Sequence, residues 1–196
     1  MDFGLTEEQV MIVDSARIFV QEELYPFEEE IENSDNVPPE ILDRITKKAK
    51  EVGFYAANMP SDLGGGGLDP VSLCLLEREL GRASFALQYA VARPSNILRA
   101  CVGTQVDAYL KPVIHGEKVE CLAMTEPDAG SDLRSMKCKA TRDGDDYIIS
   151  GTKHFISHAD IADFVILFAT TGLETTKGVG RNLITSFLVD KGTPGF

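Results

Sequence analysis

The spacing of hydrophobic positions changes once along the chain, close to Lys118. Upstream of this residue, apolar side chains recur at intervals of three and four, the spacing of helices that bury one face. Downstream they alternate with polar side chains every second residue, which is typical of strands with one buried face. The pattern therefore predicts a helical N-terminal domain over residues 1–118 and a β domain over residues 119–196.

Capping and breaking residues bound the predicted helices. Thr6 and Gln9 fit a capping box, and Asp69 before Pro70 fits a cap followed by a first-turn proline. Prolines and glycines supply the other boundaries, so the predicted helices cover residues 7–25, 39–52, 70–80, 84–101 with an interruption at Pro94, and 104–110. The residues expected on the buried face of the third helix are Val71, Cys74, Leu75 and Leu80.

The second half of the chain reads as strands joined by turns. Strands are predicted over residues 119–123, 136–141, 147–149, 164–169 and 186–189, with a hairpin turn at Asp143 and Gly144. The stretch 164–169 is apolar throughout, as in a strand buried on both faces. Helices followed by strands, without alternation, indicate an α+β protein with segregated domains rather than a doubly wound sheet.

Composition narrows the function classes. The 196 residues are 43% hydrophobic and 26% charged, and no stretch approaches the roughly 20 apolar residues of a membrane helix, so no membrane insertion is expected. A formal net charge of −12 argues against nucleic acid as a partner. The opening residues Met1–Gly4 have neither a signal core nor the character of a transit peptide. We expect a cytoplasmic protein, or a mitochondrial matrix protein if a transit peptide has been removed.

Cysteine and histidine give no metal signal. The four cysteines have no paired Cys-x-x-Cys spacing and are expected to be buried free thiols of a reducing compartment; they are Cys74, Cys101, Cys121 and Cys138. His154 and His158 lie in a strand-and-turn context, where a helical i, i+4 pair does not form. No metal is predicted.

Two segments of the β domain carry the chemistry. The first motif, Leu122–Asp132 (LAMTEPDAGSD), runs from an apolar strand into a turn that ends in a hydroxyl and a carboxylate. Such a turn presents backbone N–H groups and small side chains at a strand end, which suits a phosphate or a polar ring edge. The second motif, Gly151–Ser157 (GTKHFIS), follows downstream. In this order and at this separation, the two motifs resemble those of the acyl-CoA dehydrogenase family of flavoproteins, and the resemblance extends over residues 5–196.

The resemblance implies an architecture and a limit. Members of the family have a helical N-terminal domain, a middle antiparallel β-barrel domain and a C-terminal helical bundle. This chain is expected to contain the first domain and a truncated barrel, with the helical bundle absent. In the family the glutamate that removes the substrate proton lies in that bundle, so no catalytic residue is assigned here. Family members are homo-oligomers, usually tetramers, and a tetramer or dimer is expected of the full-length form.

The resemblance also implies an FAD site. Thr125 is expected near the pyrimidine edge of the flavin, Phe155 against the ring, and Ile156 with Ser157 near N5. Ser131 is expected to contact the acyl-CoA substrate as well as the cofactor. The complete set of expected cofactor-binding residues is Leu122, Met124, Thr125, Gly130, Ser131, Phe155, Ile156 and Ser157.

Some positions depart from the family pattern. Asp128 stands where glycine is more usual, Phe155 where tryptophan is frequent, and Ser157 where threonine is frequent. His158 replaces a frequent asparagine, and it is either a turn residue facing solvent or an imidazole that tunes the flavin. The glycine-rich stretch 63–69 has neither a preceding strand nor a following Lys-Ser or Lys-Thr, so it is expected to be an interhelical loop rather than a phosphate cradle.

Three functions remain open on the sequence. The first is a flavin-dependent dehydrogenase that desaturates an acyl-CoA thioester between Cα and Cβ and passes electrons to a flavoprotein acceptor. The second is a relative that reoxidises its flavin with oxygen. The third is a short, non-catalytic module that binds flavin or acyl-CoA.

Overall fold

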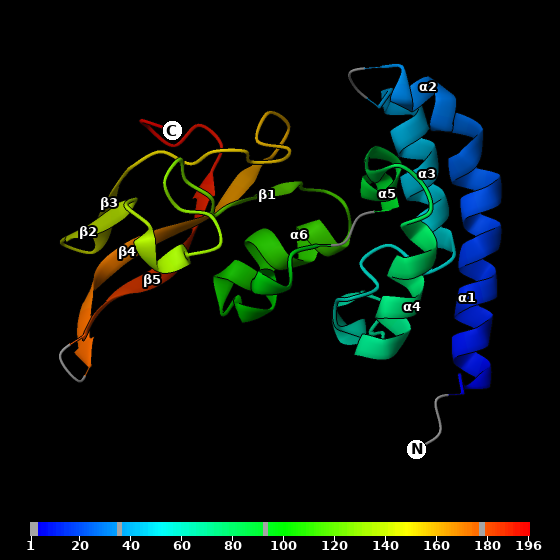
Figure 1. Cartoon of the computed structure of the whole chain (residues 1–196), viewed down its shortest axis with the longest axis horizontal. Coiled ribbons are helices and arrows are strands. Elements are labelled where there is room, and N and C mark those ends of the chain that lie inside the picture. The colour runs from blue at the N-terminus through cyan, green and yellow to red at the C-terminus, as the bar shows by residue number, and fades with distance from the viewer. Residues whose placement is uncertain (1–3, 35–36, 92–93, 177–178) are drawn as a thin grey trace. The chain divides into compact units, whose positions relative to one another are not determined.

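The computed structural model describes residues 4–34, 37–91, 94–176 and 179–196. The chain forms two compact units, a helical unit, Met1–Glu117, and a β unit, Lys118–Phe196 (Figure 1). Residues 1–3, on which the expectation about targeting partly rests, lie outside the described residues. Within the described ranges, no helix combines the length and the apolar character needed to cross a membrane.

The helical unit begins as its capping signals predict. The Thr6 hydroxyl accepts the Gln9 N–H, and the Gln9 side chain accepts the Thr6 N–H, so the predicted capping box is confirmed. Asp69 likewise accepts the N–H groups of Val71 and Ser72. The α-helices are α1 (Glu7–Phe19), α2 (Glu28–Glu32), α3 (Pro39–Glu51), α4 (Pro70–Leu80), α5 (Phe85–Val91) and α6 (Lys111–Ile114).

Three predicted helices differ in detail. The first does not end at Pro26: it continues past α1 as a π-helical turn, Val20–Leu24, and a 3₁₀ turn, Tyr25–Phe27, that leads into α2. The stretch predicted over 84–101 consists of α5 and a 3₁₀ helix, Asn96–Ala100; residues 92–93 between them lie outside the described residues. The last helix runs on from a π-helical turn, Val106–Leu110, into α6, since Pro112 in a first turn starts a helix as readily as it ends one.

The core of the helical unit lies between α1, α3, α4 and α5. Leu24, Ile45, Leu76 and Leu87 are fully buried there. The predicted buried face of α4 was partly wrong, because Val71 and Cys74 are exposed. Helical spacing fits two neighbouring faces when apolar residues are consecutive, and packing chose the face that contains Leu76.

The glycine-rich loop is an interhelical connection, as predicted. The N–H groups of Gly65, Gly66 and Gly67 donate to the carbonyls of Pro60, Ala56 and Met59. A Cβ on Gly65 would lie 2.4 Å from the Met59 carbonyl oxygen, which explains glycine at this position. Because these three N–H groups already donate to carbonyls of the preceding segment, they are not available to a phosphate, and the loop is not a phosphate cradle.

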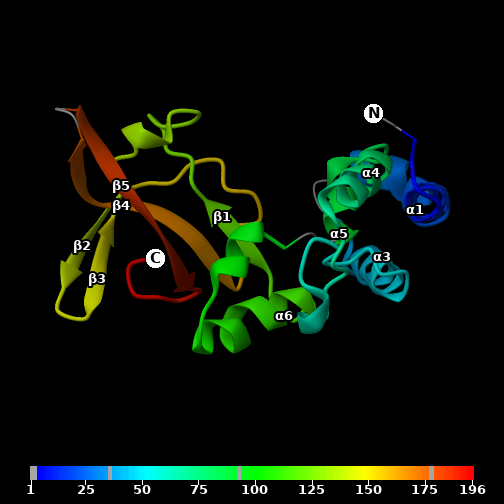
Figure 2. The same cartoon turned by 90° about the horizontal axis from the view of Figure 1, so that it is seen from below.

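In the described residues, the β unit is one sheet of five strands. The strands are β1 (Glu120–Ala123), β2 (Lys139–Asp143), β3 (Asp146–Ser150), β4 (Phe164–Thr176) and β5 (Val179–Asp190). Figures 1 and 2 show β4 and β5 as one long pair, with the hairpin β2–β3 beside them. β5 lies on one edge of β4, while β1 and then β2 pair with its other edge. Helices followed by a sheet confirm the α+β class.

The sheet is mixed rather than wholly antiparallel, which corrects the expected strand direction. β1 runs parallel to β4, with Leu122 opposite Ile166, and Lys139 of β2 also pairs in parallel with Thr170. Alternation along a strand fixes which side chains share a face but carries no information on strand direction. The predicted hairpin is confirmed, since β2 and β3 are antiparallel and Gly144 has a φ of +62° in the turn.

The β unit has an apolar cluster against one face of the sheet. Cys121 and Ala123 of β1 and Val165 and Leu167 of β4 belong to it, together with Ala140 of β2. Phe164 and Ile166 are also buried, so the prediction of a strand covered on both faces holds for this part of β4. Leu122 points away from the cluster and is 39% exposed.

Candidate functional site

The first motif leaves β1 through a short, closed turn. The Glu126 N–H donates to the Ala129 carbonyl at 2.9 Å, and the Ala129 N–H donates back to Glu126 at 3.2 Å. Pro127 and Asp128 are the two residues of the turn, and the exposed Asp128 carboxylate pairs with Lys137 Nζ at 2.6 Å. Asp128 is therefore a residue of the turn.

Glu126 is a buried carboxylate that organises this turn. It accepts the backbone N–H groups of Lys137 at 2.7 Å and Cys138 at 2.9 Å, and Lys153 Nζ at 2.8 Å. Burial raises the pKa of the Glu126 carboxyl, but the three hydrogen bonds and the Lys153 charge lower this pKa by more than burial raises it. The pKa of Glu126 therefore lies below its usual value. Glu126 is consequently ionised and fully engaged near neutral pH.

Lys153 joins the second motif to the first. Its Nζ donates to Glu126 and, at 3.1 Å, to the carbonyl oxygen of Met124. Next to it, the His154 N–H donates to the Thr125 carbonyl at 2.9 Å. The side chains of Lys153 and Glu126 are only 9% and 4% exposed. The structure therefore brings together two segments that lie apart in the sequence.

Phe155 is the most conspicuous side chain of the second motif. It is 83% exposed, and its backbone has a φ of +55°, which is unfavourable for a residue with a Cβ. The His154 ring stacks on it with centroids 3.7 Å apart and an interplanar angle of 18°. An exposed aromatic ring held in a strained backbone conformation is typical of a ligand contact.

The expected polar contacts are available to a ligand. Among the described residues, the hydroxyls of Thr125, Ser131 and Ser157 and the amides of Gly130 and Ser131 have no hydrogen-bond partner. Space around Gly130 is also open, since an added Cβ would meet nothing within 4 Å. Unpartnered donors suit the polar edge of a flavin, and exposed apolar side chains such as Leu122 and Phe155 suit its flat face.

Two of the expected contacts differ from the others. The Ile156 side chain packs on the apolar cluster of the sheet, so only its backbone is left for a ligand on the Phe155 side. Met124 is partly buried and also touches this cluster. Of the eight expected residues, Met124 and Ile156 are therefore shared with the core, and the other six are at least partly exposed. These six are Leu122, Thr125, Gly130, Ser131, Phe155 and Ser157.

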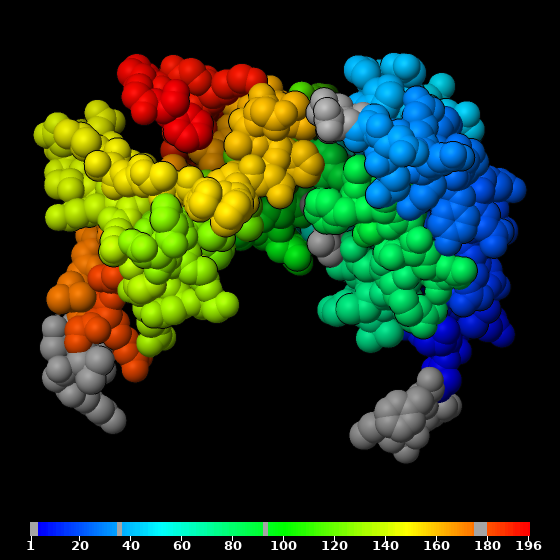
Figure 3. Space-filling view, turned by 45° about the horizontal axis from the view of Figure 1, so that its top comes forward, coloured from blue at the N-terminus to red at the C-terminus, as the bar shows by residue number. Residues whose placement is uncertain are grey.

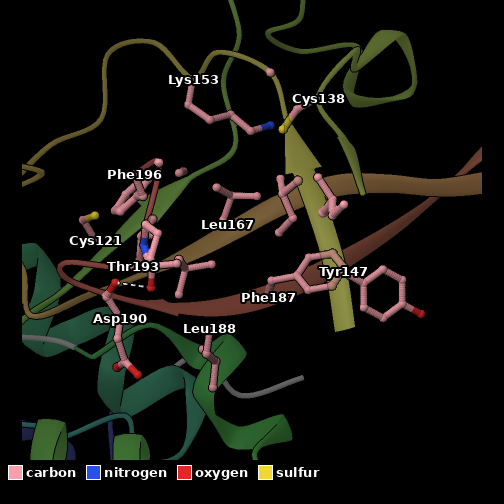
Figure 4. A pocket seen from close by; sticks show the side chains of 18 of the residues that line it. Cys121, Cys138, Tyr147, Lys153, Leu167, Phe187, Leu188, Asp190, Thr193 and Phe196 are labelled. Atoms are coloured by element: carbon pink, nitrogen blue, oxygen red, sulfur yellow. Dashed lines mark hydrogen bonds between the residues drawn. The ribbon is translucent and has the colours of Figure 1, made fainter. Parts of the chain in front are cut away.

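A hollow of about 780 Å³ lies on the face of the sheet that carries the apolar cluster, the face away from Leu122 (Figure 4). Its floor is formed by Cys121, Ala123, Val165 and Leu167, and the C-terminal residues 193–196 border it. Figure 3 shows these last residues in red, at the surface of the β unit. Cys121 and Ala123 face the hollow while Leu122 faces away. Of the residues expected to contact a flavin, Ile156 lines the hollow, whereas Thr125, Phe155 and Ser157 do not.

Two of the four cysteines are buried. Cys121 and Cys138 are buried free thiols, as predicted, and burial raises the pKa of both. Contrary to the prediction, Cys101 is half-buried and Cys74 is exposed.

His158 lies in a turn with a φ of +64° and is half-buried. Burial lowers the pKa of His158, and the nearby charge of Asp160 opposes this effect. In the part of the chain that the structure describes, no three acidic, His or Cys side chains form a metal-binding group.

Sequence reasoning missed Lys153. A lysine in a turn-like segment is normally a solvated charge, and nothing local distinguishes it from Lys137 or Lys139. The available signal was the pairing of the two motifs. Lys153 belongs to the second motif, and the first motif contains a carboxylate, Glu126, to which no role had been given. Buried carboxylates need a cation or several N–H donors, and Lys153 is that cation.

Family models match nearly the whole chain. Residues 6–117 match the N-terminal domain of acyl-CoA dehydrogenase, and residues 121–196 match its middle domain. The chain therefore belongs to the acyl-CoA dehydrogenase family.

Relatives extend the comparison. The chain is 37% identical over 196 residues to a 3-(aryl)acrylate reductase of Clostridium sporogenes, with 97% of this chain and 50% of that protein covered. It is 36% identical over 198 residues to a mitochondrial isovaleryl-CoA dehydrogenase of Pongo abelii, with coverages of 98% and 46%. Among solved structures, the FAD complex of PigA aligns with a TM-score of 0.82 and 30% identity, covering 100% of this chain and 51% of that one. The chain spans about half the length of the curated relatives it matches.

Proposed function

We propose that this chain supplies the flavin-binding part of an FAD-dependent acyl-CoA dehydrogenase. The flavin would lie across Leu122, Thr125, Phe155 and Ser157, with the amides of Gly130 and Ser131 turned to its polar groups. Ser131 would also approach the acyl-CoA. The observation that carries this proposal is the exposed Phe155 ring, fixed beside unpartnered hydroxyls by the contact between the two motifs.

The division of labour follows from the described side chains. FAD, when bound, would supply the acceptor for a hydride from the substrate Cβ. The chain's own groups would bind and orient the ring, and the Ser157 donor would stabilise charge that develops at its edge. A base must also remove the proton from Cα. Glu126 does not serve in that role, because three donors occupy its carboxylate and hold its pKa low.

Our proposals for the base, the electron acceptor and the floor of the acyl pocket concern the whole protein, and likeness to the family supports them. We propose an acyl-CoA thioester as substrate, desaturation between Cα and Cβ as the reaction, a flavoprotein as electron acceptor and a homo-oligomer as the working form. The chemistry of flavin binding is the part that this chain's own residues support.

Titration of the chain with FAD, followed by flavin fluorescence, tests the proposal. We expect saturable binding of one FAD per chain, weakened about tenfold in Phe155→Ala, since loss of one stacked ring contributes about 1.4 kcal/mol. Asp128→Asn, on the exposed side of the turn, is the matched control and should bind as the wild type does. Equal affinity in wild type and Phe155→Ala would place the flavin elsewhere.

A further inference from the structure

We propose that Glu126 and Lys153 are positioning residues, which hold the second motif on the first so that the Phe155 loop, residues 154–157, keeps the conformation needed for a ligand. This inference rests on the proposed flavin site for its purpose. The positioning itself is a property of the chain without a ligand and is tested separately.

The contacts of Glu126 and Lys153 connect the two motifs. Lys153 comes from the second motif, and its two acceptors, the Glu126 carboxylate and the Met124 carbonyl, both belong to the first. Glu126 in turn accepts the N–H groups of Lys137 and Cys138, which follow the turn. One ammonium and one carboxylate therefore connect the strand end, the segment after the turn and the second motif.

Close packing of Gly151 against Cys138 also restricts the backbone just before Lys153. Gly151 lies so near Cys138 that an added Cβ would come within 2.6 Å of the Cys138 Cα. The chain thus enters the second motif in contact with the same segment that Glu126 binds. Between Gly151 and Lys153 the backbone has little room to shift relative to the first motif.

The loop beyond Lys153 depends on this anchor. Phe155 is highly exposed and has an unfavourable positive φ, so few contacts of its own side chain select that conformation. The nearest backbone link to the first motif is the hydrogen bond from His154 to Thr125, directly after Lys153. Without the ion pair, that bond and the packing of Ile156 on the apolar cluster would be the remaining connections, and the part of the loop around Phe155 would relax to less strained conformations.

The pair is also a suitable target because both charges can be removed together. Removing one partner leaves a buried charge and destabilises a protein strongly, whereas replacing both with groups of similar volume is often tolerated. The double variant Glu126→Gln/Lys153→Met keeps the side-chain volumes and removes the attraction. The single variant Lys153→Met serves for comparison.

The readout is amide hydrogen exchange, resolved by NMR. The His154 N–H reports the joint between the motifs, since its acceptor is the Thr125 carbonyl and not either charged group. The Asp163 N–H, which donates to Val119, reports the remainder of the β unit. Glu79→Gln is the matched control, because Glu79 is an equally buried, cation-bound carboxylate that belongs to the helical unit.

In the double variant we expect His154 to exchange at least about tenfold faster while Asp163 keeps its wild-type rate; a tenfold change corresponds to about 1.4 kcal/mol. Glu79→Gln should leave the His154 rate unchanged. A His154 rate within about twofold of wild type would overturn the proposal, and so would equal acceleration of His154 and Asp163, which would show a general role in stability. If Lys153→Met unfolds, the double variant decides.

FAD titration of the same proteins separates this inference from the proposed function. If wild type binds FAD and the folded double variant binds it at least about tenfold more weakly, both are supported. If wild type binds no FAD, the flavin proposal fails, while the exchange rates still decide whether the pair positions the loop.

Discussion

Lys153 Nζ lies 2.8 Å from Glu126 Oε1, and this contact joins two motifs whose charged residues are 27 positions apart. Both side chains are almost completely buried. The relationship explains why a carboxylate inside a turn of polar residues is not a surface group. It also accounts for the shape of the candidate site, because Leu122 and Phe155 belong to different motifs that the pair holds together.

Acid should weaken the β unit through Glu126. The pKa of this carboxyl is lowered in the folded chain, so its contribution to stability is present above its unfolded pKa and is lost as pH falls through the folded value, that is, below about pH 4.5. The free energy of unfolding of wild type and Glu126→Gln, measured by urea denaturation from pH 7 to pH 3, should differ most near pH 7 and converge in acid. A difference that does not depend on pH would contradict this assignment.

Phe155 should matter for binding and hardly for stability. Because the ring is largely exposed, Phe155→Ala should change the free energy of unfolding by less than about 0.5 kcal/mol. Phe155→Trp should restore or strengthen FAD binding, since a larger flat ring occupies the same position. Thermal melts and FAD titrations of the three proteins test both statements, and a melting temperature that falls steeply in Phe155→Ala would show that the ring is structural.

The sequence predicted the elements better than their connections. Helix starts at Thr6 and Asp69 and the hairpin at Gly144 follow from local chemistry, so each could be read from a few neighbouring residues. The parallel pairing of β1 with β4 is set by the path of some forty intervening residues, and no local signal records it. The direction of β1 and β2 relative to β4 was therefore predicted wrongly.

In the candidate site, too, the sequence predicted the segments but not the contacts between them. The two motifs were recognised by their order and composition, but the ion pair between them depends on a fold that brings Lys153 beneath the first turn. The exposure of Cys74 was missed for a related reason: consecutive apolar residues on α4 fit more than one face, and the choice between faces is made by tertiary packing.

Gly65 should tolerate no side chain. In Gly65→Ala the new Cβ would lie 2.4 Å from the backbone oxygen of Met59, which cannot move without breaking the loop. We expect a loss of at least about 2 kcal/mol in the free energy of unfolding, from overpacking against backbone. Gly130→Ala, where the space is open, is the comparison and should change stability by less than about 0.5 kcal/mol. Equal melting temperatures for the two variants would refute the close approach.

Glu79 should stabilise the helical unit. Its buried carboxylate binds Arg17 of α1 at 3.0 Å and Arg78 at 2.8 Å, with Arg82 at 3.4 Å. Burial raises the pKa of the Glu79 carboxyl, but the hydrogen bonds from the three guanidinium groups outweigh it and leave the pKa lowered. Glu79→Gln should lower the free energy of unfolding by about 2 kcal/mol, the contribution of a hydrogen bond to a charged group. Urea denaturation at pH 7 measures this, and a change below about 0.5 kcal/mol would show that solvent replaces the arginines.

The most direct test of a flavin surface formed by the two motifs is amide hydrogen exchange of the chain with and without FAD, followed by mass spectrometry. We predict that FAD slows exchange in residues 122–131 and 154–157 and leaves residues 186–196, which border the hollow on the face away from Leu122, unchanged. Protection confined to residues 186–196, or no protection at saturating FAD, would contradict the account.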